Sequence, residues 1–220
     1  MSKRVVLAGA GGFGRGVYSW LASSPRHLMR EEISDIVFID DRLDSPELGL
    51  PWVSTIKGYS PEQSDEVLCC LGSPALRKSV SRDLEERGAR FHTFVDDRAI
   101  IGDRVDVGAG AVICPGVVVS ADVAISYNVH INFNCSIGHD VIIGRNATLS
   151  PSVNVMGEVT IGDSAFLGGS ATILPRLEVG SNATVGAGAV VTAPVERNVT
   201  VVGNPARQTV RRRKEKDDLG

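Results

Sequence analysis

"IGDRVDVGAGAVICPGVVVS", residues 101–120, is built on a six-residue repeat that continues through most of the second half of the chain. Every sixth residue from Ile101 to Val191 is Ile, Val or Leu. A second column, four residues after the first, runs from Val105 to Val195 and contains only Val, Ala, Leu and Cys. Two unbroken columns of this length indicate a repeat architecture.

A period of six fits neither an amphipathic helix nor an ordinary half-buried strand. Short flat strands joined by tight corners do fit it, because each unit then turns an aliphatic side chain inward and bends at Gly or another small residue. Three units form one coil of a triangular prism, and successive coils stack at about 4.8 Å. The sequence therefore predicts a parallel β-helix over residues 98–207. No long loop interrupts it, so ligands are expected on its outer wall.

The first part of the chain, residues 1–97, alternates short apolar runs with helical patterns, which predicts a small Rossmann-like βαβ domain. "RVVLAGAGGFGRG" at residues 4–16 satisfies G-x-G-x-x-G, and "DIVFIDD" at residues 35–41 ends in an acidic pair. The glycines allow a phosphate to approach a helix N-terminus. A ligand crevice is expected at the carboxyl ends of these strands; the alternative is that the glycines only form tight turns.

The composition argues against a nucleic-acid-binding protein and against a membrane-spanning protein. The net charge is -3, which does not favour nucleic-acid binding, and no apolar run is long enough to span a membrane. The N-terminus lacks the features of a signal peptide, and the four cysteines have no C-x-x-C spacing, so a cytoplasmic protein with reduced thiols is expected. No cluster has the spacing of metal ligands. Residues 208–220 are predicted to form a disordered, solvated tail.

Several motifs together carry a family resemblance: "GAGGFGRG", "FIDD", "LGS", "NFNCSIGHDVIIG", "GEVTIG", "GAGAVV" and "VVGNPAR". With the repeat, they make the chain resemble the bacterial nucleotide-sugar N-acetyltransferases of the left-handed β-helix superfamily, in the subfamily that includes sialic-acid O-acetyltransferase-like proteins. The resemblance extends to about Arg207. It implies a left-handed coil, a homotrimer, and transfer of an acetyl group from acetyl-CoA to a nucleotide-linked amino sugar. The expected sugar is a 4-amino-4,6-dideoxyhexose used for surface glycans.

The same resemblance assigns residues to roles. His139 is the expected general base, with Asp140 beside it. The substrate nucleotide is expected against Gly11, Gly12, Phe13, Asp40, Asp41, Gly72 and Ser73. Acetyl-CoA is expected near Thr148, Gly157, Gly169 and Ala187. Relatives often have histidines at the positions of Phe13 and Thr148, so the chain departs from the family pattern at these two.

An imidazole is suited to take the proton of an attacking amine, and Asp140 could fix its tautomer. Direct transfer in a ternary complex is expected, because no residue suggests itself as an acyl carrier. Two alternatives remain: O-acetylation of a sugar hydroxyl, and a non-catalytic, nucleotide-binding trimeric scaffold. His27, His92 and His130 are expected to have local structural or surface roles.

Overall fold

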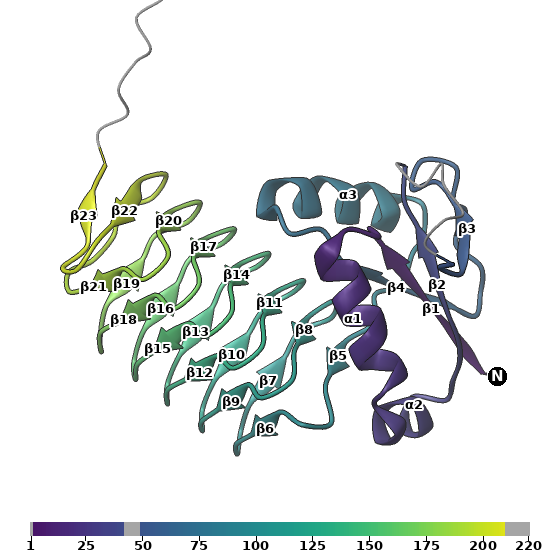
Figure 1. The fold of residues 1–220 in the computed structure, drawn as a ribbon, viewed down its shortest axis with the longest axis horizontal. Helices are drawn as coiled ribbons and strands as arrows, with labels where there is room; N and C mark the ends of the chain where they lie inside the picture. The colour runs from purple at the N-terminus through teal and green to yellow at the C-terminus, as the bar shows by residue number, and fades with distance from the viewer. Residues whose placement is uncertain (1, 42–48, 210–220) are drawn as a thin grey trace, which may run out of the picture.

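The computed structural model describes residues 2–41 and 49–209, which form a small α/β domain beside a long prism of stacked coils (Figure 1). Residues 210–220, most of the predicted tail, lie outside the described residues. No helix in the described ranges is long and apolar enough to cross a membrane.

The small domain is built on a four-stranded parallel sheet with the order β3-β2-β1-β4. Alternate side chains of β1 enter two separate cores: Val5 and Leu7 pack on the α1 side, and Val6 and Ala8 on the α3 side. The elements are β1 (Lys3–Ala8), α1 (Gly12–Ala22), α2 (Pro25–Arg30), β2 (Ile33–Ile39), β3 (Trp52–Ser54), β4 (Asp65–Cys69) and α3 (Pro74–Glu86).

The sequence patterns did not indicate β3 or α2. The apolar run "RFHTFVD", residues 90–96, is typical of a further strand of this domain, and here the structure differs. Only a single bridge, between Val67 and Phe91, joins this segment to the small sheet. Phe94–Val95 (β5) instead pairs with Val112–Ile113 (β8) and forms the first rung of the prism. The β-helix thus begins a few residues before the boundary expected at residue 98.

The prism has three faces, each a parallel sheet of very short strands. Face one continues from β5 and β8 with β11 (His130–Ile131), β14 (Thr148–Leu149), β17 (Phe166–Leu167), β20 (Thr184–Val185) and β22 (Thr200–Val202), to which β23 (Arg207–Gln208) adds antiparallel. Face two holds β6 (Ile100–Ile101), β9 (Val118–Val119), β12 (Ser136–Ile137), β15 (Asn154–Val155), β18 (Thr172–Ile173) and β21 (Val190–Val191). Face three holds β7 (Asp106–Val107), β10 (Ala124–Ile125), β13 (Ile142–Ile143), β16 (Thr160–Ile161) and β19 (Glu178–Val179).

The interior of the prism confirms the two aliphatic columns, because both line one continuous core. Strands stack eighteen residues apart, so that Ile125 pairs with Ile143 and Ile143 with Ile161. At the corners from Arg104 to Gly188, every sixth residue has a positive φ, for example Asn128 (60°) and Asn146 (58°). Asn and Asp tolerate this conformation better than most residues, which explains their frequency at the corners.

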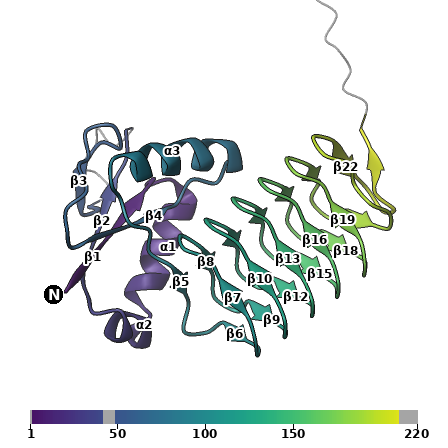
Figure 2. The ribbon, with the colours of Figure 1, turned by 180° about the vertical axis from the view of Figure 1, so that it is seen from behind.

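The small domain packs on face one of the prism, at its N-terminal end (Figures 1 and 2). Val112 and Cys114 of the prism share a core with Val5, Leu7 and Leu21 of the small domain. Helix α3 runs across the junction of the two parts, as both views show. The two parts are therefore joined by packed side chains as well as by the chain itself.

Candidate functional site

His139 lies at the corner between β12 and β13, where faces two and three of the prism meet. Its Nδ1 atom is 2.7 Å from Oδ2 of Asp140, and both side chains are 59% exposed. A carboxylate only accepts hydrogen bonds, so this contact places the proton of the neutral imidazole on Nδ1. Nε2 then carries the lone pair and can accept a proton from a bound ligand.

Gly157 lies one coil beyond His139 and determines the room available to the imidazole. A Cβ atom at position 157 would lie 2.6 Å from Nε2 and 2.8 Å from Cε1 of His139. The ring therefore occupies the space that a side chain at 157 would need. The two corners are also joined through the backbone, where N–H of Glu158 donates to O of His139 at 2.8 Å.

Asp140 also meets a conformational demand of the fold, since its φ is 55°. The residues stacked on it at the same corner have similar angles, and they carry charged side chains too. Asp122 is paired with Arg104 at 2.6 Å, and Glu158 with Arg176 at 3.0 Å. The neighbouring carboxylates are thus paired with arginines, while Asp140 is paired with His139.

Gly169 and Ala187 lie at a different corner, between faces one and two. They stack directly, as N–H of Gly188 donates to O of Gly169 at 2.9 Å. Face two separates this corner from His139 and Gly157. One copy of the chain therefore does not bring the predicted base together with these two predicted cofactor residues.

Thr148 is on β14, where face one is covered by α3. Its side chain is only 7% exposed, and its Oγ1 accepts a hydrogen bond from Arg77 at 2.8 Å. The hydroxyl oxygen is thus engaged between the two domains rather than on the open outer wall. Its place in the structure is a contact between domains, and it gives no support to the predicted contact with the cofactor.

The predicted substrate residues do come together. They lie at the carboxyl ends of three neighbouring strands, β2, β1 and β4, and at the N-termini of α1 and α3. Gly11 is the N-cap of α1, and Ser73 is the N-cap of α3, where its side chain accepts from N–H of Leu76. This edge of the sheet is the expected crevice, and the two helix N-termini that lie there favour an anion.

The glycines of this crevice divide into two kinds. Gly9 has a φ of 108°, and a Cβ on Gly14 would lie 1.9 Å from O of Gly9, so the tight turn itself requires both. At Gly11, Gly12 and Gly72 an added Cβ would meet nothing within 4 Å. The chain's own packing therefore does not explain these three, and they leave room for the close approach of a ligand.

Each carboxylate of the acidic pair accepts a hydrogen bond from a backbone N–H group. Asp40 is 6% exposed, and its Oδ2 accepts from N–H of Ala10 at 2.7 Å. Asp41 accepts from N–H of Lys57 at 3.2 Å. Asp40 thus fixes the backbone of the glycine turn, and Asp41 fixes the segment that follows β3.

Phe13 connects the crevice to the prism. Its ring lies 4.7 Å from that of His130 on β11. His130 is 1% exposed, and its Nε2–H donates to O of Cys69 at 2.9 Å. Burial lowers the pKa of His130 well below its usual range, so the imidazole is neutral. The expected structural role of His130 is confirmed.

Arg77 is the residue at this junction that the sequence patterns missed. It is completely buried, and its guanidinium donates to O of Leu71, Asn128, Asn146 and Ala147, besides Thr148. Burial lowers its pKa to about 10, so it stays charged at neutral pH. Through Leu71 it ties the loop that carries Gly72 and Ser73 to the prism.

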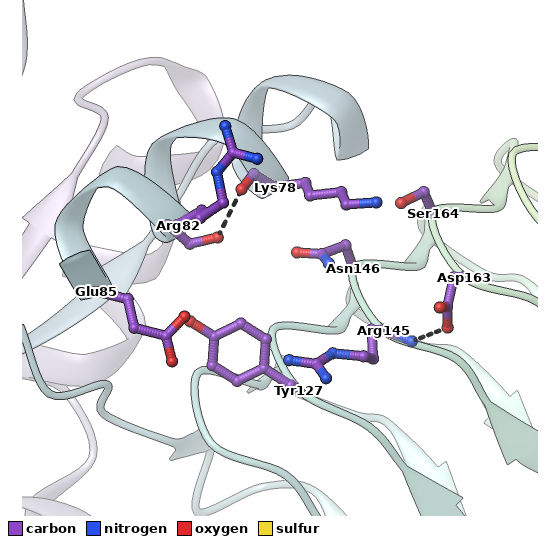
Figure 3. Close-up of a pocket in the computed structure, with 9 residues that line it drawn as sticks. Lys78, Arg82, Glu85, Tyr127, Arg145, Asn146, Asp163 and Ser164 are labelled. Carbon is purple, nitrogen blue, oxygen red and sulfur yellow. Dashed lines mark hydrogen bonds between the residues drawn. The ribbon is translucent and has the colours of Figure 1, made fainter.

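A cleft opens on the other side of this contact, between α3 and the third corner of the prism, where faces three and one meet (Figure 3). Its volume is about 350 Å³. It contains none of the residues predicted from the sequence. The described residues contain no group of three or more His, Cys, Asp or Glu side chains that could hold a metal ion.

Three family models match the chain in separate segments. The PglD N-terminal domain matches residues 4–84, the hexapeptide repeat of succinyl-transferase residues 98–132, and the bacterial transferase hexapeptide residues 158–193. A search of curated proteins gave no significant match.

Among solved structures, WeeI from Acinetobacter baumannii is 30% identical, with a TM-score of 0.84, and the match covers 94% of this chain and 100% of WeeI. The acetyltransferase domain of PglB from Neisseria gonorrhoeae, in complex with acetyl coenzyme A, is 26% identical with a TM-score of 0.84. The match covers 95% of this chain and 100% of the PglB chain. PerB from Caulobacter crescentus, in complex with CoA and GDP-perosamine, is 27% identical with a TM-score of 0.80. The match covers 94% of this chain and 97% of the PerB chain.

The fold, the repeat and these matches define the class of protein as a bacterial hexapeptide-repeat acyltransferase. The chain belongs to the family of left-handed β-helix acetyltransferases that carry a PglD-type N-terminal domain.

Proposed function

We propose that this protein transfers the acetyl group of acetyl-CoA to the amino group of a nucleotide-linked amino sugar, with His139 as the general base. The observation that carries the proposal is the pair formed by His139 and Asp140 on the outer wall, where Nδ1 faces the carboxylate and Nε2 is the nitrogen left to act as the base. The similarity to PglB with acetyl coenzyme A and to PerB with CoA and GDP-perosamine supports both substrates.

In this mechanism the amine attacks the carbonyl carbon of the thioester while Nε2 of His139 takes the proton that the amine loses. Asp140 holds the Nδ1–H and stabilises the imidazolium that forms. The tetrahedral intermediate then collapses, the C–S bond breaks, and the thiolate of CoA receives the proton from His139. No covalent enzyme intermediate is needed, which agrees with four cysteines that are all buried.

The nucleotide is proposed to lie in the crevice of the small domain. Its phosphates would be placed at the N-termini of α1 and α3, beside Gly11, Gly12 and Gly72, where no side chain blocks the approach. A 4-amino-4,6-dideoxy sugar is proposed because PerB was solved with GDP-perosamine.

The distribution of the site over two corners favours a catalytic unit made by two copies of the chain. We expect the corner with Gly169 and Ala187 of one copy to face His139 of the next copy in a closed ring of three. Face two, between these corners, exposes apolar side chains: Ile100 is 63% exposed and Val118 44%. Such a row is suited to contact with another copy.

The experiment that tests the function follows release of free thiol from acetyl-CoA in the presence of UDP-, GDP- or dTDP-linked amino sugars. The proposal predicts CoA release with at least one 4-amino-4,6-dideoxy sugar nucleotide, and a product that has gained one acetyl group by mass spectrometry. Hydroxyl-bearing analogues without the amine serve as controls. Acetylation of these analogues alone would support O-acetylation, and no turnover with any nucleotide sugar would contradict the proposal.

A further inference from the structure

The cleft between α3 and the third corner of the prism is lined by polar and charged side chains that have no part in the proposed acetyl transfer. It is lined from one side by Lys78, Ser81, Arg82 and Glu85, which share one face of α3 because they are three or four residues apart. The other side is formed by three stacked corners, at Tyr127, at Arg145 and Asn146, and at Asp163 and Ser164. Its volume of about 350 Å³ is that of a small-molecule site.

The most specific feature of the cleft is a hydroxyl without a partner. Ser164 is 8% exposed, and its Oγ atom is buried with no hydrogen-bond partner among the described residues. A buried polar atom in this state costs free energy unless something else satisfies it. The side chain of Lys78 extends across the cleft, so that its ammonium end faces the hydroxyl of Ser164 (Figure 3).

Lys78 is also uncompensated, whereas Arg82, Arg145 and Asp163 in the lining of the cleft have partners. The carboxylate of Glu85 lines the cleft as well and makes no ion pair among the described residues. Among residues 2–41 and 49–209 the ammonium group of Lys78 makes no ion pair or hydrogen bond. Arg82 pairs with Glu86 at 3.7 Å, and both side chains are largely exposed. Arg145 lies over the ring of Tyr127 at 5.2 Å, and Asp163 accepts from the backbone N–H of Arg145 at 2.7 Å.

We propose that this cleft binds the phosphate or carboxylate group of a small metabolite, with Lys78 and Ser164 as the two residues that hold the anion. An ammonium group and a hydroxyl that converge on one point match the oxygens of such a group, and hydrogen bonds assisted by charge are the strong ones. The ring of Tyr127 and the amide of Asn146 border the remaining space, where the rest of the metabolite lies.

The site is distinct from both parts of the proposed active site. It lies at the corner between faces three and one, whereas His139 lies between faces three and two, and Gly169 and Ala187 lie between faces one and two. It nevertheless shares α3 with the crevice, since Ser73 caps the N-terminus of this helix and Lys78 lies in its second turn.

The test is calorimetric titration of the whole protein with inorganic phosphate and, separately, with succinate at low ionic strength. The two arms tell a phosphate site from a carboxylate site. The variant Lys78→Met is expected to weaken binding about tenfold, which corresponds to about 1.4 kcal/mol, and Lys78→Arg to retain most of it. Ser164→Ala is expected to weaken it by about threefold.

Arg26→Met is the matched control, because it removes one exposed positive charge from the short helix α2, away from the cleft, and is expected to leave the affinity unchanged. Circular dichroism and thermal unfolding show whether each variant is folded. Loss of affinity in Lys78→Met with no loss in Arg26→Met supports the site. Binding of neither anion, or binding that is the same in Lys78→Met and Ser164→Ala as in the wild type, overturns it.

Discussion

Nδ1 of His139 and Oδ2 of Asp140 lie 2.7 Å apart at an exposed corner of the prism, and this contact determines which nitrogen of the ring can act as a base. The two residues are adjacent in sequence. The geometry arises because the corner places Asp140 in the left-handed region, at a φ of 55°. Asp140 therefore has two roles, one in the conformation of the corner and one in orienting His139, and a substitution can test them separately.

The substitution Asp140→Asn distinguishes the structural role of Asp140 from its role in catalysis. Asn accepts the left-handed conformation as readily as Asp, so the fold should be retained. The loss of the negative charge removes the stabilisation of the imidazolium, and we expect kcat to fall about tenfold to a hundredfold. Steady-state kinetics with thiol detection, together with thermal unfolding, measures both effects. A normal kcat with lowered stability would mean that Asp140 serves the corner alone.

Gly157→Ala should act on His139. The new Cβ would lie 2.6 Å from Nε2, so the imidazole must move from its position. We expect kcat to fall by about tenfold or more, since small displacements of a reacting group are costly. The same substitution in a His139→Ala background is the control, because there is then no ring to displace. An equal further loss in that background would show that Gly157 acts independently of His139.

Complementation between two inactive variants tests whether the active site is shared by two copies. His139→Ala removes the base, and Ala187→Trp blocks the other corner, where Ala187 is exposed. Each variant alone should be nearly inactive. If each site takes His139 from one copy and Ala187 from the next, random mixing in a cyclic trimer restores about a quarter of the sites.

Activity of the mixed preparation after co-refolding or co-expression measures this restoration, with the mass of each assembly checked by light scattering. A mixture as inactive as its components would place both corners in the site of a single copy or remove Ala187 from the site.

Arg77 should be important for stability. Its guanidinium satisfies carbonyl oxygens of both domains inside a buried contact, and Arg77→Met would leave several of them unpaired. We expect a loss of about 3 kcal/mol in the free energy of unfolding, measured with urea. Arg82→Met, on the exposed side of the same helix, should change it by less than about 0.5 kcal/mol. Similar effects of the two substitutions would contradict the structural role of Arg77.

The pair of buried histidines should make stability depend on pH. Nε2 of His27 lies 2.9 Å from Nε2 of His92, whose Nδ1 donates to Glu66. Burial lowers the pKa of His27 to about 4 and also lowers that of His92. Because the unfolded chain binds protons more readily, this stability is fully present above pH 6.5 and is lost as the pH falls toward 4.

Urea unfolding at pH 7.5 and pH 5.5 measures the effect, and His27→Gln should reduce the difference between the two. An unchanged difference in this variant would assign the pH dependence to other groups.

The prism was predictable because burial in a repeat is a local property. A residue six positions on from an inward aliphatic one is again inward, whatever the rest of the chain does. That Gly169 and His139 lie at different corners could also have been derived from the sequence by counting residues. The two are thirty residues apart, which is not a multiple of the eighteen residues in one coil, so they cannot share a corner.

The junction between the domains was not predictable in the same way. "PALRKSVSRDLEERG", residues 74–88, is a helical pattern in which Arg77 and Lys78 look equally exposed. Which of the two is buried depends on how α3 docks on the prism, and no repeat or motif encodes that docking. The same holds for Thr148 and His130, whose side chains point outward from face one and are buried only because the small domain covers it.

The central claim is that His139 removes the proton of the attacking amine, and the kcat of His139→Asn tests it most directly. The assay uses saturating acetyl-CoA and the best amino-sugar nucleotide. We predict that kcat falls by about a hundredfold or more, while the oligomeric state and the affinity for acetyl-CoA stay the same. A kcat equal to that of the wild type would contradict the account.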